Sequence, residues 1–307
     1  MSIDVALWAL CLLVGIALQR REGSARLNER IWRVYFLTLA PAVVLFAYST
    51  VTVDRALVSS LVLVAATSWT VLGLALGYGA AVARSRAEQG AIALCSAWGN
   101  SAALGYPLTQ LAFGAHGLAL QALFAQFAFG VPAVAVSTTV ARRYGAAVER
   151  PVDVPRAHRL RTALARNPPL LAALVAVGLR LGGVDLHDAV MPIGRIAGVL
   201  TGLVGFLQLG LSMPLHRVAH DVGDLGRAAG VLVLRHAVAP LLLVGAGAAL
   251  GVDVPGVFVL AAGLPVAFHL VTLAAVFDVR PDLVRLLVVV STIGAVAAIV
   301  AGVAVFG

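Results

Sequence analysis

The chain has 307 residues, of which 61% are hydrophobic and only 12% are charged, and its mean hydropathy is +0.99. Soluble domains carry about 25% charged residues, so this composition excludes an ordinary soluble domain and indicates a helical protein that crosses a membrane several times. The net charge of +8 comes from arginine alone, because the chain has no lysine. The arginines cluster between apolar runs, where they orient spans, so we expect the lipid bilayer as a partner and not nucleic acid.

Ten apolar runs follow one another along the chain in two sets of five. The first set lies at about 4–20, 31–50, 57–83, 90–112 and 117–141. The second set lies at about 168–182, 190–213, 228–250, 255–277 and 283–306. A helix needs about 20 residues to cross the hydrocarbon core. The predicted fold class is therefore an all-α polytopic membrane protein with ten transmembrane helices.

An arginine-rich segment separates the two sets of runs. We predict residues 1–141 as a first five-helix repeat, 142–167 as a cytoplasmic linker and 168–307 as a second five-helix repeat. Because each half has an odd number of spans, the two halves enter the membrane in opposite directions, and related halves then form a 5+5 inverted repeat. The loops on the side of the linker hold most of the arginines, so the positive-inside rule places both termini outside.

Glycine and proline interrupt the fourth run of each half at corresponding positions. Gly99, Gly105 and Pro107 interrupt the first of these runs, and Gly263 and Pro265 interrupt the second. Such residues weaken or break helices, and inside a membrane the freed backbone groups must find partners in the protein. Each interruption alone could be an ordinary kink. Two in corresponding spans are typical of a transporter binding site.

Several stretches resemble the auxin efflux carrier family of membrane transporters, which includes the PIN auxin exporters and bacterial malate- or malonate-permease-like proteins. The stretches are GNSAALGYPL from Gly99, RNPPLLAALVAVGL at 166–179 and AAGLPVAFHLVTLAAVFDV at 261–279, with LCLLVGIALQRR and LAPAVVLF similar to the opening two spans. The resemblance implies a 5+5 inverted repeat whose fourth and ninth helices are broken and cross. It also implies an elevator-like movement of a transport domain against a scaffold.

The polar side chains inside the predicted spans are neutral or basic, and we expect no buried carboxylate. Asn100 is the main candidate for substrate binding, because its amide can donate to a carboxylate, although it could instead cap the broken helix. Ser101, His269 and Thr272 are supporting candidates, and His269 could equally be satisfied by a neighbouring helix. Arg235 adds positive potential if it faces the interior, or snorkels to the membrane surface if it does not.

The two prolines are expected to create half-helix starts. The free N–H groups and positive dipole ends of such starts favour an anion. Together with the lack of buried carboxylates, this favours a small organic anion as the substrate.

We interpret the chain as a secondary transporter in the cell membrane that moves a small organic anion such as a carboxylate by alternating access. We expect no enzyme activity, catalytic residue, metal site or cofactor, because the sequence has no hydrolase, metal-binding or nucleotide-binding motif. One alternative is a sodium-coupled organic-acid carrier resembling the bile-acid symporters, with an ion site of carbonyls, Asn100 and hydroxyls. Another is a non-transporting sensor or scaffold that binds a partner through residues 142–167. A homodimer is left open.

Overall fold

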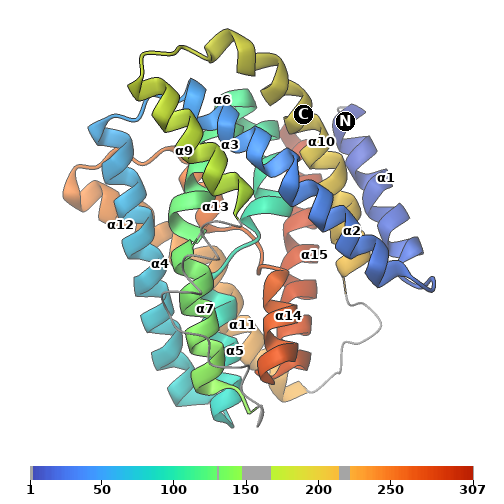
Figure 1. The fold of residues 1–307 in the computed structure, drawn as a ribbon. Helices are drawn as coiled ribbons and strands as arrows, with labels where there is room; N and C mark the ends of the chain where they lie inside the picture. The colour runs from blue at the N-terminus through green and yellow to red at the C-terminus, as the bar shows by residue number, and fades with distance from the viewer. Residues whose placement is uncertain (1–2, 130, 147–166, 214–221, 307) are drawn as a thin grey trace. The chain divides into compact units, whose positions relative to one another are not determined.

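The computed structural model describes residues 3–129, 131–146, 167–213 and 222–306, so most of the predicted linker lies outside the described residues. Within these ranges every regular element is a helix, and extended backbone pairs in a single isolated β-bridge (Figure 1). The prediction of an all-α chain is confirmed.

The apolar runs coincide with helices. Those from the first set are α1 (Ile3–Leu18), α2 (Ser24–Leu37), α3 (Leu39–Thr50), α4 (Arg55–Val82), α5 (Arg86–Ala97), the π turn η1 (Ser101–Gly105), α6 (Tyr106–Phe129) and α7 (Val131–Tyr144). Those from the second set are α9 (Pro168–Leu181), α10 (His187–Ser212), α11 (Val222–Val233), the π turn η3 (Leu234–Val238), α12 (Ala239–Leu250), α13 (Gly256–Ala262), α14 (His269–Phe277) and α15 (Pro281–Phe306). Among the described residues, 6 helical segments are long and apolar enough to cross a membrane, and α1 and α9 supply shorter apolar helices. The protein is therefore a multi-pass membrane protein.

Some helix boundaries depend on single residues. Asn167 caps α9, because its side-chain Oδ1 accepts a hydrogen bond from Leu170 N at 3.1 Å, and two prolines follow in the first turn. Gly114 interrupts α6 with a φ of 67° and a ψ of −158°, a conformation that suits glycine and no other residue. This interruption falls in the gap that the sequence leaves between the fourth and fifth apolar runs.

The described chain forms two compact units. Unit 1 consists of Met1–Asp54, Ser101–Gln126 and Val154–Met213, and unit 2 consists of Arg55–Asn100, Phe127–Asp153 and Pro214–Gly307. Each unit takes segments from both halves of the sequence. The units therefore group the helices by packing and not by the predicted repeats.

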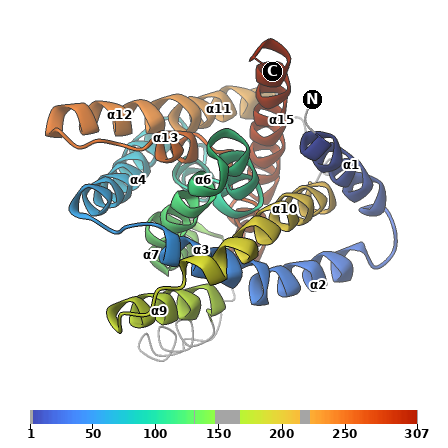
Figure 2. The same ribbon diagram turned by 90° about the horizontal axis from the view of Figure 1, so that it is seen from above.

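Unit 1 is packed around α10, which contacts α1, α2, α3 and η1 (Figure 2). Glycines make the approach of α1 and α10 close: a Cβ on Gly210 would overlap the carbonyl of Leu12, and one on Gly15 would lie 2.8 Å from the Cα of Gly210. One turn away, the rings of Trp8 and Phe206 stack with centroids 5.4 Å apart. Small residues at the contact let two membrane helices pack backbone against backbone.

Unit 2 is built around α5, which contacts α4, α7, α11, α14 and α15. Residues 90–97 of this helix are all buried. A helix that is covered on every side shows no apolar stripe, which explains why the sequence here is apolar throughout. In Figure 2, α11 and α12 continue one another through η3, and α12 packs against α4.

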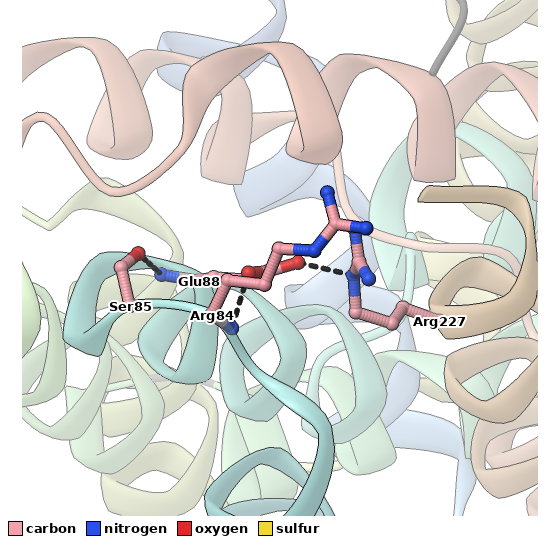
Figure 3. Close-up of polar contacts among 4 residues, drawn as sticks. All are labelled: Arg84, Ser85, Glu88 and Arg227. Atoms are coloured by element: carbon pink, nitrogen blue, oxygen red, sulfur yellow. Dashed lines mark hydrogen bonds and ion pairs between the residues drawn. The ribbon is translucent and has the colours of Figure 1, made fainter. Parts of the chain in front are cut away.

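Glu88 corrects the expectation that no carboxylate is buried. It lies in the first turn of α5, and its exposed fraction is 0%. Its Oε1 forms an ion pair with Arg227 Nε, its Oε2 accepts a hydrogen bond from Arg84 N at 2.7 Å, and its own N–H donates to Ser85 Oγ at 3.2 Å (Figure 3). A carboxylate is tolerated away from water when a cation and backbone donors satisfy it. Residue spacing does not reveal this pair, because Arg227 comes from α11.

Replacing Glu88 with glutamine should destabilise the protein, because it removes the negative charge that pairs with the buried Arg227. Breaking a buried pair in this way costs about 3–5 kcal/mol of unfolding free energy. Thermal unfolding of the purified protein in detergent measures the loss. Glu29→Gln is the matched control, since Glu29 and Arg33 pair at 3.0 Å with side chains 71% and 69% exposed, and such pairs contribute no more than about 1 kcal/mol. Equal shifts for the two variants would contradict the burial of Glu88.

Replacing Gly210 with alanine should also destabilise the protein, because the added methyl has no room against α1. Overpacking of this kind costs about 1–3 kcal/mol. Gly178→Ala on α9 is the control, since a Cβ there meets no atom within 4 Å. Its unfolding midpoint should stay close to that of the wild type. An unchanged midpoint for Gly210→Ala would disprove the close contact of α1 and α10.

Candidate functional site

The two interrupted stretches lie side by side in unit 2. Non-helical residues follow the end of α5 at Ala97 and the end of α13 at Ala262. The two segments pair in an antiparallel β-bridge between Gly99 and Val266. Asn100 N donates to Pro265 O at 2.7 Å, and Ala267 N donates to Trp98 O at 3.1 Å. The two breaks thus satisfy part of each other's backbone, as a membrane interior requires.

The second break occurs where its sequence removes helical hydrogen bonds. Gly263 ends α13, and its N–H donates to the carbonyls of Val259 at 3.3 Å and Leu260 at 3.1 Å. Pro265 has no N–H and lies in the non-helical segment between α13 and α14, where its carbonyl accepts the hydrogen bond from Asn100 N. The half-helix α14 begins at His269, four residues after the proline. Pro265 therefore belongs to the segment that forms the β-bridge and does not itself start the half-helix.

The first break lies earlier than expected. The helix restarts at Ser101 in the π turn η1, so Gly105 and Pro107 fall inside the restarted helix and not at the break. The expectation that Pro107 starts the half-helix is therefore wrong. Proline cannot donate to the carbonyl four residues before it, here that of Ala103, and its ring crowds that carbonyl, which a wider π turn accommodates. In unit 1 the Ala103 carbonyl lies against Gly205 of α10, where a Cβ would overlap it.

Arg235 connects the two breaks. It lies in the π turn η3, and its exposed fraction is only 2%. Its Nε donates to Leu264 O at 2.8 Å, its Nη1 to Ala97 O at 3.0 Å and its Nη2 to Ala261 O at 3.4 Å. Of the two alternatives for this residue, the interior position is the one that the structure shows. Its donors bind backbone at both interruptions.

Gly99 is required by the guanidinium of Arg235. A Cβ on Gly99 would overlap Arg235 Nη2 and lie 2.9 Å from Cζ. The glycine thus has two roles: it weakens α5 at its end, and it leaves room for the arginine that holds the break.

Sequence reasoning missed two further residues that organise the second break. His236 Nδ1 lies 2.8 Å from Gly263 O, and because a carbonyl can only accept, Nδ1 must carry the proton. Ser291 Oγ accepts a hydrogen bond from Val266 N at 3.1 Å and lies 3.2 Å from Val288 O. In the sequence, His236 and Ser291 are each a polar residue within an apolar run. That position does not indicate which backbone group the side chain contacts.

The remaining predicted residues lie in different settings. Asn100 is buried at the paired breaks, with an exposed fraction of 6%. His269 and Thr272 are exposed and lie three residues apart on α14, so they share one face of that helix. Ser101 is half-buried and belongs to unit 1, where its carbonyl accepts a hydrogen bond from Gln121 Nε2 at 3.0 Å. In unit 2 the structure joins Asn100 and Arg235 to the same pair of breaks.

The charged and polar groups at the paired breaks are the ends of two helix dipoles and the guanidinium of Arg235. Two helices, α5 and α13, end there, so their negative dipole ends lie at the guanidinium. Within the described residues, no group of three or more His, Cys, Asp or Glu side chains is arranged to hold a metal ion.

A family of known proteins matches the second part of the chain. The sequence model of the family described as membrane transport protein matches residues 157–301, a range that includes Arg235, His236 and the whole second break. Among curated proteins, none matches the chain. The family match supports the resemblance that the stretches at 166–179 and 261–279 carry. Residues 157–301 thus resemble a membrane transport protein family, in agreement with the likeness to the auxin efflux carriers.

Proposed function

We propose that the protein is a secondary transporter that moves a small organic anion, such as a carboxylate, across the cell membrane by alternating access. The observation that carries this proposal is the pairing of two helix breaks inside an apolar unit, with Asn100 at the pairing. Interrupted helices at membrane depth are the sites at which secondary transporters bind solutes.

Three features support an anion as the solute. Asn100 is buried at the paired breaks, and its side-chain amide is a donor that suits a carboxylate. His269 and Thr272 add donors on an exposed face of α14. Arg235 adds positive potential at the breaks. Its Nε and Nη1 already donate to backbone carbonyls, so we assign it no direct hydrogen bond to the substrate.

The same proposal includes the finer architecture: ten spans in a 5+5 inverted repeat, divided at residues 142–167, with both termini outside. Unit 2 contains both breaks, and the β-bridge and the Arg235 hydrogen bonds tie them together. We therefore assign unit 2 as the body that moves with the substrate. Unit 1, packed through α1 and α10, is assigned as the scaffold.

Asn100→Ala should reduce transport, because it removes the amide that we assign to the substrate carboxylate. A hydrogen bond to a charged group contributes about 1.5–3 kcal/mol, so uptake efficiency should fall about ten- to a hundredfold. Uptake of radiolabelled carboxylates into proteoliposomes measures the change.

The control for this experiment is Asn28→Ala. Asn28 carries the same amide, but its Nδ2 donates to Ser212 Oγ at 2.9 Å in unit 1, away from the break residues in the sequence. Uptake by this variant should stay close to wild type when equal amounts of folded protein are compared. Undiminished uptake by Asn100→Ala would remove Asn100 from the site, and no uptake of any carboxylate by the wild type would overturn the proposed function.

A further inference from the structure

The guanidinium of Arg235 occupies a set of carbonyls that converge from both breaks. The set consists of Ala97 O at the end of α5, and Ala261 O and Leu264 O at and after the end of α13, at 2.8–3.4 Å from the three guanidinium nitrogens. All three belong to unit 2. We call these three oxygens the carbonyl cage.

The carbonyl cage is a place where a positive charge is needed. Helices α5 and α13 both end at it, and each helix C-terminus carries about half a negative charge. Carbonyls freed by a helix break cannot bond to lipid. In secondary transporters, unwound carbonyls and half-helix C-termini are the groups that coordinate a coupling Na⁺. An ion at this position would neutralise the two helix ends and bridge the two breaks.

We propose that Arg235 is a tethered cation that takes the place of a coupling Na⁺ in the carbonyl cage, so that transport by this protein does not require Na⁺. The statement about Na⁺-independent transport rests on the proposed function. The position of Arg235 in the carbonyl cage rests only on its hydrogen bonds. A planar fork of five N–H donors can satisfy several carbonyls at once, and it stays charged.

Two features of the chain favour a tethered cation over an ion that exchanges with the solution. Gly99 leaves the space that the guanidinium fills, since a Cβ there would overlap Nη2. The π turn η3 supplies both Arg235 and His236, and His236 bonds the next carbonyl of the same break, that of Gly263. π turns are rare and are found mostly at functional sites. The chain therefore uses two adjacent basic side chains to satisfy one break.

The test measures occupancy of the cage without any transport substrate. Thermal unfolding of the purified protein is followed in NaCl, KCl and choline chloride at equal ionic strength. An ion that binds only the folded state raises the midpoint by mass action, so a Na⁺ site would give a rise of a few degrees at about 100 times its dissociation constant. We expect no Na⁺-specific rise for the wild type.

Arg235→Ala should lower the unfolding midpoint by several degrees, because it empties the cage and leaves the carbonyls unsatisfied. Millimolar methylguanidinium should restore most of the loss, whereas choline at the same concentration should not. Arg195→Ala is the matched control, because Arg195 lies in the helix α10 but is exposed. This variant should keep the wild-type midpoint and should not respond to methylguanidinium.

Arg235→Lys covers the case in which the alanine variant does not fold. Lysine keeps the charge but offers only three donors from one atom, so its midpoint should lie below that of the wild type. A Na⁺-specific rise in the wild type, or a wild-type midpoint for Arg235→Lys, would overturn the tethered cation. So would an alanine variant that folds but does not respond to methylguanidinium.

The transport arm separates this inference from the proposed function. Uptake of a carboxylate into proteoliposomes should differ less than twofold between Na⁺ and choline buffers. Uptake that needs Na⁺ would refute the tethered cation and leave the transporter in place. A protein that transports no carboxylate but shows the expected midpoints would refute the anion transporter and leave the tethered cation in place.

Discussion

The contact between the Arg235 guanidinium and the carbonyls of the two breaks is the interaction on which the rest of unit 2 depends. Two helices must end inside an apolar layer for the breaks to exist, and each end leaves carbonyls that lipid cannot satisfy. Arg235 resolves this for both ends at once through Ala97 O and Leu264 O. Burying an arginine in a membrane costs free energy, but here its guanidinium donates hydrogen bonds to carbonyls at both helix ends.

Several other features follow from this one contact. Gly99, which forms the bridge with Val266, leaves room for the guanidinium, since a Cβ there would overlap Arg235 Nη2. The two non-helical segments can pair through a single bridge, because the guanidinium and the Ser291 hydroxyl form hydrogen bonds with other backbone groups of the breaks. The anion that we propose as substrate then meets a site whose negative helix ends are already neutralised.

The apolar runs located the long helices of the described residues, because length and hydropathy decide which segments enter a membrane, but they did not reveal that the run at 31–50 divides into α2 and α3. The paired glycines and prolines also located the second break within a few residues. The first break was misplaced, since the π turn at Ser101–Gly105 lets the helix pass through Pro107, and helix width depends on packing and not on composition. The burial of Glu88 was likewise beyond sequence reasoning, and the sequence left the inward position of Arg235 as one of two alternatives. Each depends on a partner that the fold brings from a distant segment.

Amide hydrogen exchange at the two breaks tests the central claim most directly. In wild-type protein in nanodiscs, peptides that contain Asn100 and Ala267 should exchange as slowly as helix interiors, because these amides donate to Pro265 O and Trp98 O. In Arg235→Ala both peptides should exchange faster together, while Arg195→Ala should leave them unchanged. Fast exchange at either break in the wild type, or acceleration at only one of them in Arg235→Ala, would contradict the account that one arginine holds two paired breaks.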